Sequence, residues 1–105
     1  MNNFILNYAI AGNYNSGNPI VSIDIASPGI YLLIGYNHNQ NNLAVWLNGI
    51  ADQNDFGYLR LQNDGCIAKI FSVGNTQTFK LMNLSGQTMN VNTSTYLGAI
   101  RLGDL

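Results

Sequence analysis

The sequence predicts an all-β sandwich built from a single domain, and three observations support that prediction. Helical periodicity is absent, because Asn and Gly interrupt every stretch long enough to form a helix. Short runs of β-forming residues recur, with turn residues between them, at the spacing typical of a sandwich. The chain has 105 residues, which suits one domain and not two. We therefore expect residues 1–105 to fold as one unit.

The strands follow from runs of apolar, aromatic and β-branched residues. In chain order we expect them at residues 4–11, 20–25, 29–36, 43–48, 56–62, 66–73, 76–82, 89–91 and 95–102. The segments between them are rich in Asn, Asp and Gly, which tolerate the positive φ of tight turns. We expect the clearest hairpin turns at 63–65 and 74–75, and a solvated hairpin loop at 37–42.

The strand at 29–36 has no polar face. Ile30, Leu32 and Ile34 share one face with Tyr36, while Tyr31 and the residue at 33 take the other. A small sandwich buries only one face of each sheet in its own core, so the second apolar face needs a further layer. Another copy of the same chain is the simplest source of that layer, and we expect an obligate oligomer.

The last strand, at 95–102, is also apolar on both faces. An exposed edge of this kind would invite aggregation, so we expect the strand to lie inside a sheet. This placement suits a jelly roll, in which the first and last strands lie side by side.

Three segments resemble a known family. Pro-Gly-Ile-Tyr-Leu-Leu-Ile at 28–34, a polar loop, and Asn-Leu-Ala-Val-Trp-Leu-Asn-Gly at 42–49 resemble the strand pair of complement C-one-q heads. Ser-Thr-Tyr-Leu-Gly-Ala-Ile-Arg-Leu at 94–102 resembles the closing strand of that family. The resemblance implies a compact jelly roll related to tumour necrosis factor, assembled as a homotrimer about a three-fold axis. The middle of the chain departs from the family pattern, and the Asn-rich surface resembles small knobs on viral and phage fibres and bacterial filaments.

A trimer needs interface residues, and those we expect to form it are Tyr31, Leu33, Tyr96 and Arg101. If the face that carries Arg101 meets the three-fold axis, its guanidinium needs an acceptor, which Asp24 or Asp104 of a neighbouring copy could supply. The alternative is that Arg101 lies at the strand end and reaches water.

Composition excludes several classes of function. Only 9% of the residues are charged, the formal net charge is -1, and Glu is absent. The chain therefore has no basic surface for nucleic acid. No apolar stretch is long enough for a membrane helix, and residues 1–7 lack the basic region of a signal peptide. We expect a protein of a virion or an extracellular appendage, made without a cleaved signal peptide and not inserted in a membrane.

Residues that could carry catalysis or bind a metal are sparse. His38 is the single histidine, and the spacing alone does not show whether any Ser or Cys66 lies beside it, so a solvated loop residue is the simpler interpretation. Asp52, Asn54 and Asp55 share one loop and offer oxygen ligands for Ca²⁺, but a solvated turn explains them more simply. Cys66 is the single cysteine and is read as a small buried apolar residue. We expect no enzyme, no cofactor and no metal.

Three loops are candidates for contact with a ligand, at 12–18, 37–42 and 52–55. Aromatic rings together with amide and carboxylate groups suit sugars, which need both donors and acceptors. The alternative is that Asn simply keeps a charge-poor protein soluble and its turns tight. The candidate residues are Tyr14, Asn15, Asn37, His38, Asn39, Gln40, Asp52, Asn54 and Asp55.

The function expected from these features is a non-enzymatic, trimeric head that recognises a receptor, with a cell-surface glycan as the ligand. Three copies of each loop would add weak contacts through multivalency. The second hypothesis is a structural trimerisation cap or decoration with no ligand. A small hydrolase is the third.

Overall fold

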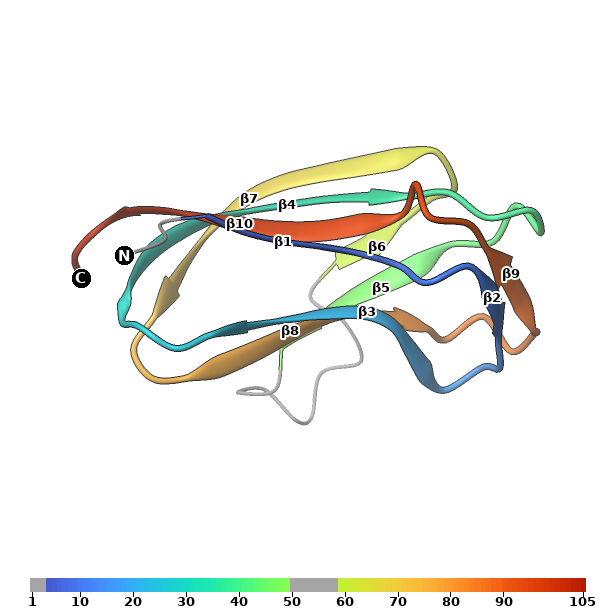
Figure 1. The fold of residues 1–105 in the computed structure, drawn as a ribbon, viewed down its shortest axis with the longest axis horizontal. Helices are drawn as coiled ribbons and strands as arrows, with labels where there is room; N and C mark the ends of the chain where they lie inside the picture. The colour runs from blue at the N-terminus through green and yellow to red at the C-terminus, as the bar shows by residue number, and fades with distance from the viewer. Residues whose placement is uncertain (1–3, 50–58) are drawn as a thin grey trace.

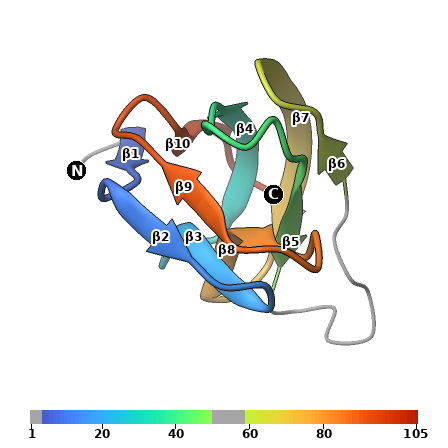
Figure 2. The ribbon, with the colours of Figure 1, turned by 90° about the vertical axis from the view of Figure 1, so that its right-hand side faces the viewer.

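The computed structural model describes residues 4–49 and 59–105, which form an antiparallel β-sandwich (Figure 1). The first sheet has the strand order β1-β10-β4-β7, and the second has the order β3-β8-β5-β6. A short third sheet pairs β2 with β9 and closes one end, the end that faces the viewer in Figure 2. The strands are β1 (Phe4–Tyr8), β2 (Gly12–Tyr14), β3 (Asn18–Ile25), β4 (Gly29–Asn37), β5 (Val45–Gly49), β6 (Leu59–Leu61), β7 (Gly65–Val73), β8 (Gln77–Asn83), β9 (Met89–Val91) and β10 (Tyr96–Gly103).

The predicted all-β jelly roll is confirmed. β1 and β10, the first and last strands, pair along their length from Phe4–Ile100 to Tyr8–Tyr96. β10 also pairs with β4, so the apolar last strand lies inside its sheet, as predicted. In the described ranges, 4–49 and 59–105, no helix is long and apolar enough to cross a membrane.

The chain turns at the two predicted positions, but the strands that flank each turn do not pair as a hairpin. The turn at 63–65 is tight: Gly65 N donates to the carbonyl of Gln62 at 2.9 Å, and Asp64 has φ of 60°. A Cβ at position 65 would lie 2.7 Å from that carbonyl, so glycine is required. However, β6 and β7 on either side belong to different sheets, as do β7 and β8 around 74–75. Turn residues fix how sharply the chain reverses, whereas the strand that pairs is chosen by sheet packing.

Sequence reasoning missed β2, which it assigned to a loop. This strand is only three residues long and contains Gly12 and Asn13, so it shows no apolar alternation. It is held instead from outside, by pairing with β9 and by a hydrogen bond from Asn90 Nδ2 to Asn13 Oδ1 at 3.0 Å. The predicted first strand also ends earlier than expected, at Tyr8.

The core lies between the two four-stranded sheets. From Val21 onward the alternation in β3 is regular, with Val21, Ile23 and Ile25 buried and Ser22 and Asp24 exposed. The first sheet supplies the opposite wall, and the hydroxyl of its buried Tyr31 donates to the carbonyl of Ser27 at 2.8 Å. The fully buried large side chains are Phe79, Ile25, Leu33, Leu47, Leu81, Met89, Leu97, Val45, Val73 and Val91.

Candidate functional site

The outward side of the first sheet carries neither a charge nor an amide side chain. Pairing registers place one apolar row across four strands, from Phe4 through Ile100 and Leu32 to Ile70. We call this side the apolar outer face. Its members are Phe4, Leu6 and Tyr8 of β1, Tyr96, Gly98 and Ile100 of β10, Ile30, Leu32, Ile34 and Tyr36 of β4, and Cys66, Ala68, Ile70 and Ser72 of β7.

Several of these side chains are open to solvent in the single chain. Phe4 is 47% exposed, Tyr8 is 53% exposed and Ile70 is 60% exposed. Cys66 is also exposed, so the interpretation of a buried cysteine was wrong. With strands about 4.8 Å apart and a rise of about 3.4 Å per residue, the face covers on the order of 400 Å² in projection. The largest apolar patch of a monomer commonly reaches this size and is often functional.

Two of the predicted interface residues lie on the other side of the sheet. Tyr31 and Leu33 are 4% and 0% exposed and belong to the core of the sandwich, so they cannot meet a second copy. That prediction was wrong because alternation shows that both faces of β4 are apolar but does not show which one turns inward. Tyr96, in contrast, does lie on the apolar outer face, opposite Tyr36.

Arg101 is also turned away from the apolar outer face. Its register partner is Tyr31, so it shares the inward side of β10 with Leu97 and Ala99, which are fully buried. The guanidinium lies at the strand end and finds acceptors in its own chain. It donates to the carbonyl of Pro28 at 2.9 Å and to Asp104 Oδ1 at 2.7 Å. No acceptor from a neighbouring copy is needed.

An aromatic row marks one end of the apolar outer face. The rings of Tyr8 and Tyr96 lie 5.8 Å apart, and those of Tyr96 and Tyr36 lie 6.0 Å apart. Tyr36 in turn stacks on His38, with 5° between the ring planes. Oδ1 of Asp64 accepts from the Tyr36 hydroxyl at 2.8 Å and pairs with His38 Nδ1 at 2.7 Å. His38 is therefore held in place and is not a free loop residue.

These contacts shift the pKa values of Asp64 and Tyr36 in opposite directions. Hydrogen bonds from His38, first, and from Tyr36 stabilise the Asp64 carboxylate and hold the pKa of Asp64 below its ordinary value. The hydrogen bond that the Tyr36 hydroxyl donates to this carboxylate stabilises the protonated phenol, so the pKa of Tyr36 is raised. Nucleophilic catalysis with His38 as the base would need a hydroxyl or thiol bonded to the imidazole, and among the described residues none is hydrogen-bonded to the His38 ring.

The loop at 37–42 is an internally bonded structure, not a solvated hairpin, because β4 and β5 belong to different sheets. Asn37 is fully buried, and its Nδ2 donates to the carbonyl of Leu43 at 3.1 Å. Asn39 is 2% exposed; its Oδ1 accepts from Leu43 N at 2.9 Å, and its Nδ2 donates to the Leu43 carbonyl at 2.7 Å. Asn63 adds a bond from the neighbouring turn, accepting from Asn39 N at 2.8 Å. We call Asn37, Asn39 and Asn63 the amide network.

The amide network corrects two ligand predictions. Asn37 and Asn39 use their polar atoms to satisfy buried backbone groups, so they cannot contact a ligand. Gln40 and Asn15 do lie on the surface, and Tyr14 is half-buried with its hydroxyl bonded to the carbonyl of Ile10 at 2.6 Å. The remaining three candidates lie outside the described residues; these are Asp52, Asn54 and Asp55.

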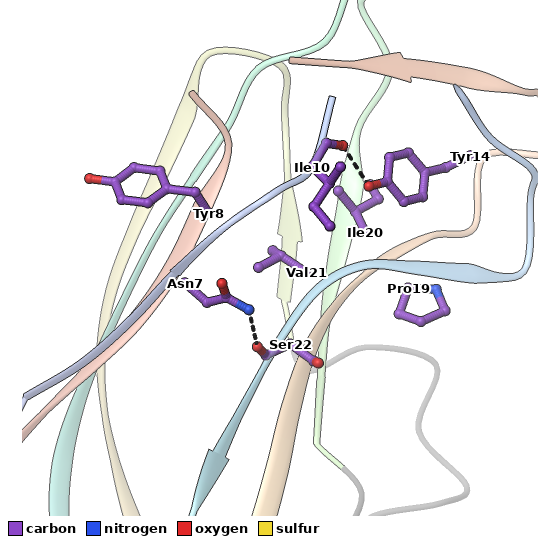
Figure 3. Close-up of a pocket in the computed structure, with 8 residues that line it drawn as sticks. All are labelled: Asn7, Tyr8, Ile10, Tyr14, Pro19, Ile20, Val21 and Ser22. Carbon is purple, nitrogen blue, oxygen red and sulfur yellow. Dashed lines mark hydrogen bonds between the residues drawn. The ribbon is translucent and has the colours of Figure 1, made fainter. Parts of the chain in front are cut away.

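A pocket of about 190 Å³ lies where the two sheets leave an open edge, between β1 and β3 (Figure 3). We call it the edge pocket. Two hydrogen bonds tie its walls together: Asn7 Nδ2 donates to the carbonyl of Ser22 at 3.0 Å, and Tyr14 bonds Ile10. Sequence analysis selected Tyr14 but not Asn7 or Ser22. The available signal was the adjacent apolar pair Ile20-Val21, which breaks the alternation of β3.

Metal ligands do not gather anywhere in the part of the chain that the structure describes. Within residues 4–49 and 59–105, no group of three or more His, Cys, Asp or Glu side chains could hold a metal ion.

The comparison with solved structures agrees with this architecture, whereas no family model and no curated protein matches the chain. Among solved structures, the fold is similar to that of GITRL from bushbaby, with a TM-score of 0.57. The fold is a tumour-necrosis-factor-like jelly roll. The match covers 87% of this chain and 76% of that chain at 23% identity, so it bears on the fold alone.

Proposed function

We propose that this chain is a non-enzymatic recognition head that works as a homotrimer, with its apolar outer face buried between copies. The observation that carries this proposal is that the face has no charged or amide side chain, although Asn is abundant elsewhere in the sequence. Leaving such a surface in water would favour aggregation, whereas burying it in a closed ring of copies would not.

Three copies are proposed for two reasons. The fold resembles that of a tumour-necrosis-factor-family ligand, and the sequence segments at 28–34, 42–49 and 94–102 resemble complement heads. Both resemblances point to assembly about a three-fold axis. The hydroxyls of Tyr8, Tyr96 and Tyr36 suit the wet rim of such an interface, because a tyrosine packs its ring while its oxygen stays hydrated.

The arrangement of the chain ends supports presentation of loops. Phe4 and the C-terminus lie at one end of the sandwich, and β2 and β9 lie at the other (Figure 1). Exposed amides gather at the β2–β9 end, including Asn13, Asn15 and Gln40. We propose that this end faces outward from the tip of a viral or phage fibre or a bacterial filament. Its ligand would be a cell-surface glycan.

The native mass tests the proposal, by size-exclusion chromatography with light scattering. We expect three times the chain mass of 11.5 kDa. A monodisperse monomer would overturn the trimer and the role assigned to the apolar outer face. If the trimer forms, a glycan array then tests recognition, with the Asn13→Ala and Asn15→Ala variants as loop probes.

One observation favours a second function, a structural trimerisation cap without a ligand. Much of the amide chemistry at the β2–β9 end is used internally: Asn41 Oδ1 accepts from Asn90 N at 2.6 Å, and Asn83, fully buried, donates to the carbonyls of Tyr14 and Gln87 at 2.9 Å. A trimer that binds no glycan and whose removal dissociates a parent assembly would support the cap.

A further inference from the structure

The edge pocket has an apolar floor that a bulge in β3 creates. The pairing of β3 with β8 shifts between Pro19 and Val21, so one extra residue is accommodated there. As a result Ile20 and Val21, adjacent in sequence, both turn inward and are each 5% exposed. A bulge re-aims side chains, and here it lines the bottom of the pocket with two branched aliphatic groups.

The rim of the pocket is polar but uncharged. Asn7 reaches across the open edge from β1, and its Nδ2 is occupied by the carbonyl of Ser22. Its Oδ1 accepts no hydrogen bond from any described residue and is free to accept one from a ligand. Tyr14 forms a side wall that its bond to the Ile10 carbonyl fixes (Figure 3). The ring of Tyr8 turns away from the pocket, toward the apolar outer face (Figure 3).

We propose that the edge pocket binds the acetamido group of an N-acetylated sugar. This inference rests on the proposed function, because it names the substituent by which the glycan is recognised. The acetamido methyl would lie over Ile20 and Val21, its N–H would donate to Asn7 Oδ1, and the sugar ring would pack against Tyr14.

The chemistry of the pocket favours this group over two other occupants. A plain hexose would place hydroxyls over Ile20 and Val21, where they would find no partner and binding would lose free energy. A purely apolar side chain would leave Asn7 Oδ1 desolvated and unpaired. An anionic or cationic group would meet no countercharge, because no charged residue lines the pocket. An acetamido group has both the methyl and the donor that the pocket requires.

The test is a titration of the ¹⁵N-labelled full chain with N-acetylglucosamine, followed by NMR, with glucose as the matched sugar. We expect saturable shifts at the amides of Ile20, Val21 and Ser22 with N-acetylglucosamine, and weaker binding of glucose by about tenfold or more. Asn7→Leu removes the acceptor at an exposed position and should weaken binding by about tenfold. Asn75→Leu, an exposed amide remote from the pocket, is the matched control and should bind as the wild type does.

A second variant is needed because Asn7→Leu could weaken binding by altering the fold. Ile10 is 78% exposed at the mouth of the pocket, so Ile10→Trp should shield it while leaving the fold intact. It should abolish the shifts at Ile20 and Val21. Equal binding of glucose, or binding of N-acetylglucosamine that survives both Asn7→Leu and Ile10→Trp, would overturn this inference. Shifts confined to the β2–β9 loops would also overturn it while leaving the recognition head in place, and the native mass tests the trimer separately.

Discussion

The two outer faces of the sandwich cover the same core and differ completely in chemistry. The apolar outer face of the first sheet has no charge and no amide. The outward side of the second sheet carries Ser22 and Asp24 of β3, Thr78, Lys80 and Met82 of β8, Trp46 and Asn48 of β5, and Arg60 of β6. We call this second side the polar outer face. Even its tryptophan is covered, since the Arg60 guanidinium lies 5.6 Å from the centre of the Trp46 ring.

The difference between the two outer faces shows that alternation of polar and apolar residues depends on what covers each side of a sheet. In the second sheet, polar residues alternate with apolar ones because one side faces the core and the other faces water. In the first sheet the outward side is apolar as well, although the inward side already supplies core residues such as Leu33, Leu97 and Ala99. Because selection for the core alone does not require apolar residues on an outward side, the pattern indicates a second burial outside the single chain.

The largest expected effect comes from placing a charge on each face in turn. Leu32→Lys puts an ammonium in the centre of the apolar outer face, where burying it between copies would be prohibitive, so the proposed trimer should dissociate to monomers. Thr78→Lys makes the same change on the polar outer face, beside Asp24, and should leave three copies together. Light scattering reads both results. A trimer that persists in Leu32→Lys would show that the face is not an interface.

Substitution of two neighbouring leucines on β4 distinguishes burial in the core of one chain from burial between copies. Leu33→Ala removes a fully buried core side chain and should cost about 2–5 kcal/mol at every protein concentration. Leu32→Ala acts on the apolar outer face, so its cost should rise with protein concentration, because assembly stabilises only the folded chain. Urea denaturation at two concentrations measures both. A Leu32→Ala effect independent of concentration would argue against assembly through this face.

The amide network gives a smaller effect, at the end of the sandwich. Asn39→Ala leaves the backbone N–H of Leu43 without its side-chain acceptor, and the Leu43 carbonyl keeps only the donor from Asn37. The change should destabilise the fold by about 1–3 kcal/mol. Gln40→Ala, at the exposed neighbouring position, is the control and should change the stability by less than about 0.5 kcal/mol. Thermal or urea unfolding gives the comparison. Equal effects would mean that Asn39 has no structural role.

The smallest effect concerns pH at the rim of the apolar outer face. The pKa of Asp64 is lowered in the folded chain, so its carboxylate stabilises the fold above the ordinary aspartate pKa, and this stability is lost as the pH falls through the lowered pKa. Asp64→Asn should therefore be less stable than the wild type at neutral pH and converge with it in acid. The difference is small because Asp64 is open to solvent. A gap that persists unchanged in acid would show that the charge is not its cause.

Local patterns along the chain were enough to predict the class of fold and the places of most strands. Period-two patterns and turn residues are local signals, and they identified every strand of the two main sheets. The position of β10 inside its sheet also followed from its apolar character. β2 could not be found in this way, because its stability comes from its pairing with β9 and not from its own residues.

The tertiary structure alone decided which residues are left for function. Leu32 and Leu33 are chemically identical neighbours, and only the packing of one sheet on the other turns the first outward and the second inward. Asn39 and Gln40 are equally polar neighbours, and only the folded loop buries one amide and exposes the other. The edge pocket likewise joins Asn7 of one sheet to Ser22 of the other. Composition and spacing give the chemistry of each side chain. Whether it is buried, and which strand it pairs with, depends on residues distant in sequence that meet only when the two sheets pack.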